Sequence, residues 1–117
     1  MGRNRKYFTI EEQKEAKEND TVSFEYKQAK QKAEEYMSFT SFSKKGLKEQ
    51  LEFEGFSNEA SVYAVDNITV NWNEQCAKKA EEYLNVMSFS REGLYEQLAF
   101  EGFSDEQIQY GLSLVGY

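Results

Sequence analysis

The sequence contains the same segment twice. Residues 33–63 align with residues 80–110 at a constant offset of 47 positions, and 19 of these 31 positions are identical. A period of this length indicates that one small structural unit was duplicated, so fold and function are best considered one unit at a time. The duplication also provides an internal comparison, in which positions kept by both copies are expected to serve the architecture.

The length and the cysteine content limit how such a unit can be stabilised. The 117 residues are enough for one ordinary domain or two very small ones, and a unit of about 45 residues is near the lower limit for folding alone. Cys76 is the only cysteine and there is no histidine, so we expect no intrachain disulfide, no zinc site and no cofactor. The two copies are therefore expected to pack on each other, or to rely on cores rich in the nine Phe and eight Tyr.

Each unit is predicted to form three helices. The first helix of each unit is expected at about 24–38 and 72–85, where apolar residues recur at helical spacing. Serine N-caps and glycine turns define the others: Ser43 and Gly55 bound the second helix of the first copy, and Ser57 begins the third. Ser90, Gly102 and Ser104 repeat this pattern in the second copy.

The apolar residues of these helices are assigned to the two cores. The inward-facing sets are Leu47, Leu51 and Phe53 with Leu94, Leu98 and Phe100 in the second helices, and Tyr63, Ala64 and Ile68 with Tyr110, Leu114 and Val115 in the third. There is no proline and no convincing alternating strand pattern. The predicted fold is all-α, with two tandem three-helix repeats of helix-turn-helix geometry at 24–69 and 70–117. They follow a flexible polar tether at 1–23, in which the run at 11–18 is expected to form fraying helix.

The charge distribution limits which partners the chain can bind. Fourteen basic residues oppose 21 acidic ones, and residues 69–117 carry three cations against eight acids. An acidic surface repels phosphate backbones and attracts basic polypeptides. The helix-turn-helix geometry keeps a DNA-binding regulator as the alternative function, but neither third helix, 58–67 or 105–114, contains a cation. We therefore expect no binding of nucleic acid.

An enzyme is not predicted. The sequence has no histidine, and Cys76 fits a core position better than a nucleophile, since activation needs a neighbouring base or cation. Glu54 and Glu101 are repeated near helix C-termini, where the helix dipole disfavours negative charge, so they are expected to make a local hydrogen bond, for example to backbone amides of the next helix. Trp72, at the junction of the copies, is left with two readings: junction packing or an exposed contact.

A long motif stands in both copies. It runs from Phe42 through Ser43, Gly46-Leu47, Gln50-Leu51 and Phe53-Glu54-Gly55 to Phe56, and again from Phe89 to Phe103. This motif resembles the repeat of the host cell surface-exposed lipoprotein (Ltp-type) family, and the resemblance covers about residues 24–117. It implies a prophage-encoded protein, lipid-anchored on the outer face of a Gram-positive cell membrane, that excludes superinfecting phages by blocking DNA injection. The implied target is the incoming phage's tape measure protein.

The expected mode of binding follows from the resemblance and the charge. The family's signal peptide and lipid-attachment cysteine are not found in this sequence. Membrane contact is therefore expected only through an anchor that the chain as given does not carry. The chain itself is expected to be a soluble monomer. A basic, helical partner such as a tape measure protein would dock on acidic side chains. The predicted contact residues are Glu49, Glu52, Glu59 and Asp66 in the first copy and Glu96, Asp105 and Glu106 in the second.

Overall fold

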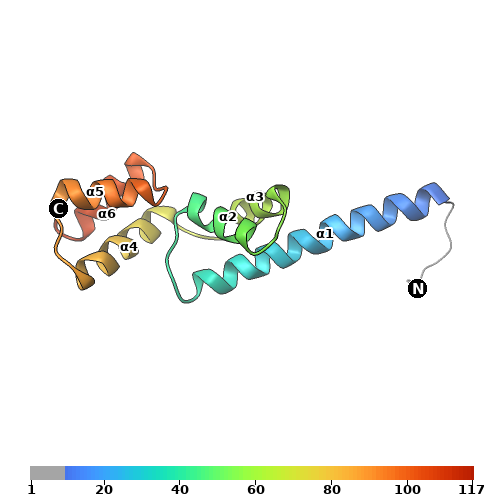
Figure 1. Ribbon diagram of the computed structural model, residues 1–117, viewed down its shortest axis with the longest axis horizontal. Coiled ribbons are helices and arrows are strands. Elements are labelled where there is room, and N and C mark those ends of the chain that lie inside the picture. The colour runs from blue at the N-terminus through green and yellow to red at the C-terminus, as the bar shows by residue number, and fades with distance from the viewer. Residues whose placement is uncertain (1–9) are drawn as a thin grey trace.

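The computed structural model describes the backbone from Ile10 to Tyr117 and the side chains from Phe24 onward. This part of the chain contains six helices and no strand (Figure 1). The helices are α1 Ile10–Met37, α2 Lys44–Phe53, α3 Asn58–Asn67, α4 Trp72–Val86, α5 Arg91–Phe100 and α6 Asp105–Leu114. The prediction of an all-α fold built from two tandem three-helix repeats is confirmed.

The two repeats lie one after the other along an elongated molecule of 64 × 22 × 21 Å (Figure 1). Within each repeat the first and third helices pack most extensively, α1 on α3 and α4 on α6. Each repeat has its own core. The first is built from buried Ala and Leu side chains with Val65, and the second from Cys76, Ala80, Ile108, Phe103 and three leucines.

The helix ends follow the predicted caps and turns. The hydroxyl oxygens of Ser43 and Ser90 accept hydrogen bonds from the amides of Gly46 and Gly93. Ser57 caps α3 and Ser104 forms a full capping box with Gln107 in α6. Gly55 and Gly102 have φ of 106° and 104°, the left-handed conformation that the predicted turns require.

The first helix begins much earlier than predicted. α1 starts at Ile10 rather than near residue 24, so the helix continues through residues 10–23 of the predicted tether. The composition of this stretch explains the error. Its polar run favours helix locally but offers no apolar stripe, and the prediction required that stripe. The rest of the predicted flexible tether, residues 1–9, lies outside the described residues.

Three side chains predicted to face the cores are exposed instead. Phe53 is 85% exposed, Phe100 is 84% exposed and Leu114 is 60% exposed. The expectation that Phe53, Phe100 and Leu114 belong to the cores was therefore wrong. In α6 the buried positions are Ile108, Gly111 and Leu112, and Gly111 lies so close to Cys76 that a Cβ atom there would come within 3.1 Å of its Sγ.

The repeats meet through a small polar contact. Ser41 donates a hydrogen bond of 2.8 Å to a carboxylate oxygen of Glu82, and Ser43 donates one of 2.5 Å to the backbone oxygen of Glu101. Both serines are only 2% exposed. Trp72, the first residue of α4, packs against the core of the first repeat, which confirms the junction-packing reading.

Candidate protein-binding surface

The predicted acidic residues of the first repeat lie at the surface beside lysines of α2. Glu49, Glu59 and Asp66 are exposed and Glu52 is partly exposed. Three ion pairs involve this group: Lys45–Glu49 at 3.8 Å, Lys48–Glu52 at 2.9 Å and Lys44–Asp66 at 2.7 Å. Exposed pairs of this kind contribute little to stability, but they neutralise the local potential. The first repeat is therefore less acidic at its surface than its carboxylates alone suggest.

The second repeat keeps two of these four carboxylates, Glu49 and Glu59 as Glu96 and Glu106, gains Asp105, and has lost two of the three lysines. The positions of Lys45 and Lys48 are occupied by Glu92 and Tyr95. Glu96, Asp105 and Glu106 are exposed, and among the described residues none of the three forms an ion pair. Negative potential is thus concentrated on α5 and the start of α6.

Asp105 is held in its charged form. The Tyr95 hydroxyl donates a 2.6 Å hydrogen bond to its carboxylate, and the Gln109 amide lies at 3.5 Å. The hydrogen bond from Tyr95 lowers the pKa of the Asp105 carboxyl below its ordinary value, because it stabilises the ionised form. The same contact raises the pKa of Tyr95. Asp105 therefore contributes a full negative charge at neutral pH.

The third helices do not form a basic surface. The cations that contact these helices are paired with their side chains: Lys44 pairs with Asp66 of α3, and Arg91 donates to the Gln109 side chain of α6 at 2.8 Å. Neither α3 nor α6 contains Lys or Arg. In a helix-turn-helix DNA-binding protein this helix enters the major groove and needs cations nearby to hold the phosphates. The geometry therefore does not favour nucleic acid as the ligand.

The repeated carboxylates Glu54 and Glu101 have a structural role. The Tyr36 hydroxyl donates to Glu54 and the Tyr83 hydroxyl donates to Glu101, in both cases tying the end of the second helix to the first helix of the same repeat. A local hydrogen bond was predicted, but the donor is a tyrosine rather than a backbone amide. Burial and the Glu101 contact raise the pKa of Tyr83 to about 12. These carboxylates therefore hold the end of the second helix against the first helix in each repeat.

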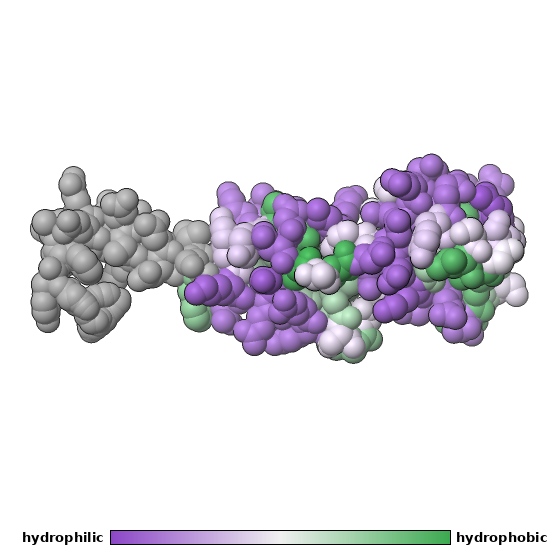
Figure 2. Space-filling view, turned by 180° about the vertical axis from the view of Figure 1, so that it is seen from behind, coloured by the Kyte–Doolittle hydropathy of each residue, from purple (hydrophilic) through white to green (hydrophobic). Residues whose placement is uncertain are grey.

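The outer faces of the second helices carry phenylalanines that the sequence prediction assigned to the cores, beside glutamates that it predicted as contacts. Phe53 and Glu49 are one turn apart on α2, and Phe100 and Glu96 are one turn apart on α5; all four are exposed. We call each Glu–Phe pair an outer pair. On the face shown in Figure 2, hydrophilic side chains cover most of both repeats and hydrophobic atoms appear only in small patches. Among the described residues, Phe53 and Phe100 are the most exposed large hydrophobic side chains, at 85% and 84%, ahead of Val86 at 77%.

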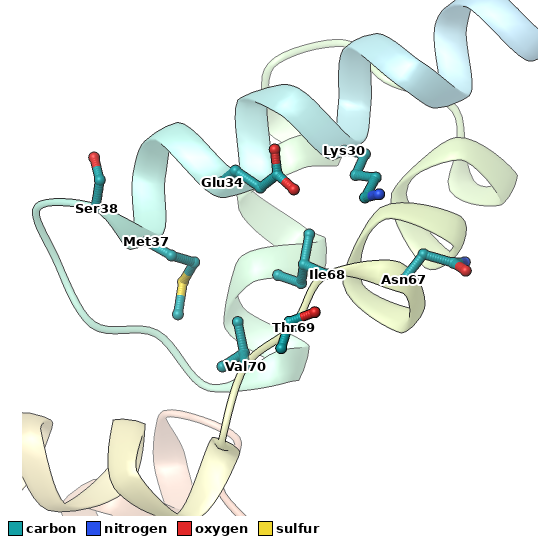
Figure 3. A pocket seen from close by; sticks show the side chains of 8 residues that line it. All are labelled: Lys30, Glu34, Met37, Ser38, Asn67, Ile68, Thr69 and Val70. Carbon is teal, nitrogen blue, oxygen red and sulfur yellow. The ribbon is translucent and has the colours of Figure 1, made fainter.

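A shallow groove lies beside the linker between the repeats. Its lining residues, labelled in Figure 3, are Lys30, Glu34 and Met37 of α1, Ser38 just after it, and the segment from Asn67 at the end of α3 to Val70. The groove encloses about 260 Å³ and mixes apolar, amide and charged groups.

The one thiol, Cys76, is buried in the second core, and burial raises its pKa to about 12. The thiol thus lacks the exposure and the lowered pKa of a nucleophile.

Comparison with known proteins accounts for both repeats. The model of the family described as host cell surface-exposed lipoprotein matches residues 24–68 and, separately, residues 71–115. The chain belongs to this lipoprotein family. The two matches coincide with the two structural repeats, the first from Phe24 within α1 to the end of α3 and the second from the start of α4 to just past α6.

A solved structure shares the fold and much of the sequence. It is Ltp, a superinfection exclusion protein from the Streptococcus thermophilus temperate phage TP-J34. It aligns with 36% identity and a TM-score of 0.71, over 76% of this chain and 93% of that chain. No curated protein matches the chain. In the part of the chain that the structure describes, no helix is both long enough and apolar enough to cross a membrane.

Proposed function

We propose that this member of the lipoprotein family excludes superinfecting phages by binding the incoming phage's tape measure protein at the cell surface, so that phage DNA does not pass. The observation that carries the proposal is the likeness to Ltp, which at 36% identity covers nearly all of that superinfection exclusion protein. The surface supports binding, because exposed carboxylates and phenylalanine rings lie together on helices fixed by N-caps.

The acidic surface of the second repeat is the proposed contact for the partner. Glu96, Asp105 and Glu106 are exposed, form no ion pair within the described residues, and lie on helices fixed by N-caps. A basic segment of a long helical protein would be attracted to this surface, whereas a phosphate backbone would be repelled by like charge. In the first repeat Glu49, Glu52 and Asp66 contribute less, because lysines already pair with them.

The duplicated sequence supplies a matched test of this assignment. Glu96 and Glu106 correspond to Glu49 and Glu59, 47 positions earlier. We expect a Glu96→Lys, Glu106→Lys double variant, displayed on a sensitive host, to lose exclusion of phage DNA while phage adsorption continues. The Glu49→Lys, Glu59→Lys variant changes the same net charge at equivalent positions and should lose less.

Two measurements interpret the result. Far-UV circular dichroism of both purified variants should match the parent chain, since the four substituted side chains are exposed and outside both cores. Equal protection by all three proteins would contradict the electrostatic contact. Equal loss in both double variants would show that total charge, and not the second repeat, governs binding.

A further inference from the structure

The outer surfaces of α2 and α5 can be compared position by position. Four positions of these helices are exposed in both repeats. They are the pairs Lys44/Arg91, Lys45/Glu92, Glu49/Glu96 and Phe53/Phe100. The first pair has a packing role in each repeat, since Lys44 pairs with Asp66 and Arg91 bonds to Gln109. The second pair reverses charge between the copies.

Of these four positions, only the two that make up the outer pairs are identical in both repeats. Glu49 has Lys45 at 3.8 Å, but Glu96 has a glutamate at the matching position, so the ion pair is not what the two copies share. Phe53 and Phe100 are 85% and 84% exposed and bury almost nothing within the chain. A partner that covered such a ring would gain free energy by removing apolar area from water.

We infer that each outer pair is a docking element for one amphipathic, cationic helix, which places an apolar side chain on the phenylalanine ring and a lysine or arginine, one turn away, on the glutamate. The inference rests on the proposed function only in taking a phage protein as the natural partner. Charge complementarity selects this occupant, because each ring lies one turn from a carboxylate on the same helix face. A second copy of this chain, with seven excess negative charges, would be repelled.

The two elements differ in strength. On α5 Glu92 lies one further turn before Glu96, which gives a row of two carboxylates and a ring, whereas on α2 Lys45 takes the place of Glu92 and partly neutralises Glu49. A cationic helix should therefore bind α5 more tightly than α2. Phe100 is the stronger anchor and Phe53 the weaker one.

A direct binding experiment tests the element without any phage. The probe is a synthetic 20-residue helix of leucine and lysine arranged on opposite faces, with a second peptide in which alanine replaces every leucine. Fluorescence anisotropy measures binding to the full chain, to the Phe53→Ser, Phe100→Ser variant, and to a Phe39→Ser control. Phe39 is 74% exposed but corresponds to Val86, so it is not shared by the repeats.

We expect the double phenylalanine variant to bind the leucine–lysine helix about tenfold to a hundredfold more weakly, the range for losing a buried aromatic anchor. The Phe39→Ser control should bind like the parent chain. The alanine–lysine peptide should bind all three proteins equally, since charge alone holds it. Of the single variants, Phe100→Ser should cost more than Phe53→Ser.

The inference is overturned if the double variant binds the leucine–lysine helix as the parent does, or if the parent does not prefer that helix over the alanine–lysine peptide. An exclusion assay separates this result from the proposed function. Retained peptide binding with no phage exclusion would remove the proposed function and leave the docking element. Phage exclusion that survives the loss of both rings would leave the proposed function and remove the outer pairs as the docking element for the phage protein.

Discussion

The glycines that end the second helices offer a matched test of how tightly the repeats pack. Gly55 and Gly102 have nearly the same backbone, with φ of 106° and 104°. Their surroundings differ. A Cβ atom on Gly55 would meet nothing within 4 Å, whereas one on Gly102 would lie 2.9 Å from Ser43 Oγ and 3.0 Å from Lys45 Cβ, across the contact between repeats. Comparing the single variants Gly55→Ala and Gly102→Ala therefore separates the cost of backbone strain from the cost of disturbing the packing of one repeat on the other.

The expected magnitudes follow from these distances. Gly55→Ala adds only the cost of a left-handed alanine, about 1–2 kcal/mol. Gly102→Ala adds the same strain and also pushes on a backbone-linked Cβ atom, which costs about 1–3 kcal/mol as overpacking. The push also weakens the hydrogen bond from Ser43 to the Glu101 carbonyl, a further loss of about 0.5–1.5 kcal/mol. We expect Gly102→Ala to be the more destabilising variant by about 2 kcal/mol.

Urea unfolding followed by circular dichroism at several protein concentrations gives the two free energies of unfolding. Small-angle scattering on the same samples reports whether the repeats stay in contact, because the elongated shape would change if they separated. Equal losses of stability together with an unchanged scattering profile would refute the tight contact at Gly102. Close packing predicts a larger loss of unfolding free energy for Gly102→Ala than for Gly55→Ala, or equal losses with repeats that have separated.

Three further outcomes can be measured on the purified chain. Because burial and Glu101 raise the folded-state pKa of Tyr83 to about 12, its contribution to stability should be complete below pH 10 and lost as the pH rises from 10 to 12, and Tyr83→Phe should flatten that loss in urea titrations. Cys76, fully buried, should react with a thiol reagent only as fast as the second repeat opens, so the rate should rise with urea. Ser41→Ala should cost about 1 kcal/mol in thermal unfolding, whereas Ser88→Ala, at the exposed equivalent position, should cost less than about 0.5 kcal/mol.

The fold was predictable because its local signals are strong and are stated twice. Each short helix has a serine cap at one end, and Gly55 and Gly102 end α2 and α5, so helix boundaries could be placed without tertiary information. The extent of α1 could not be placed in this way. Residues 10–23 have no apolar stripe, and the prediction had no other signal with which to distinguish a continuing helix from a coil.

The misplaced core residues share one geometric cause. Phe53 lies six positions after Leu47, Phe100 six after Leu94, and Leu114 six after Ile108. Six residues turn a helix by about 600°, which leaves the side chain about 240° round from the buried one, so all three point outward. Leu51, Leu98 and Leu112, four positions on, return to within about 40° and are buried. These three residues were assigned to the cores because they are hydrophobic, although their angular positions around the helices place them outside.

The exposed rings also change what the duplication means. Positions kept by both copies were expected to serve the architecture, and Tyr36 with Glu54 meets that expectation, since its hydrogen bond recurs in the second repeat as Tyr83 with Glu101. Phe53 and Phe100 do not, because a side chain about 85% exposed holds no helix in place. Identity between repeats therefore has two sources in this chain, and burial distinguishes them. A buried or bonded match is explained by the fold. The matching rings bury almost nothing within the chain, and beside Glu49 and Glu96 they offer apolar area as well as charge, which is why we favour the outer pairs over carboxylates without a neighbouring ring.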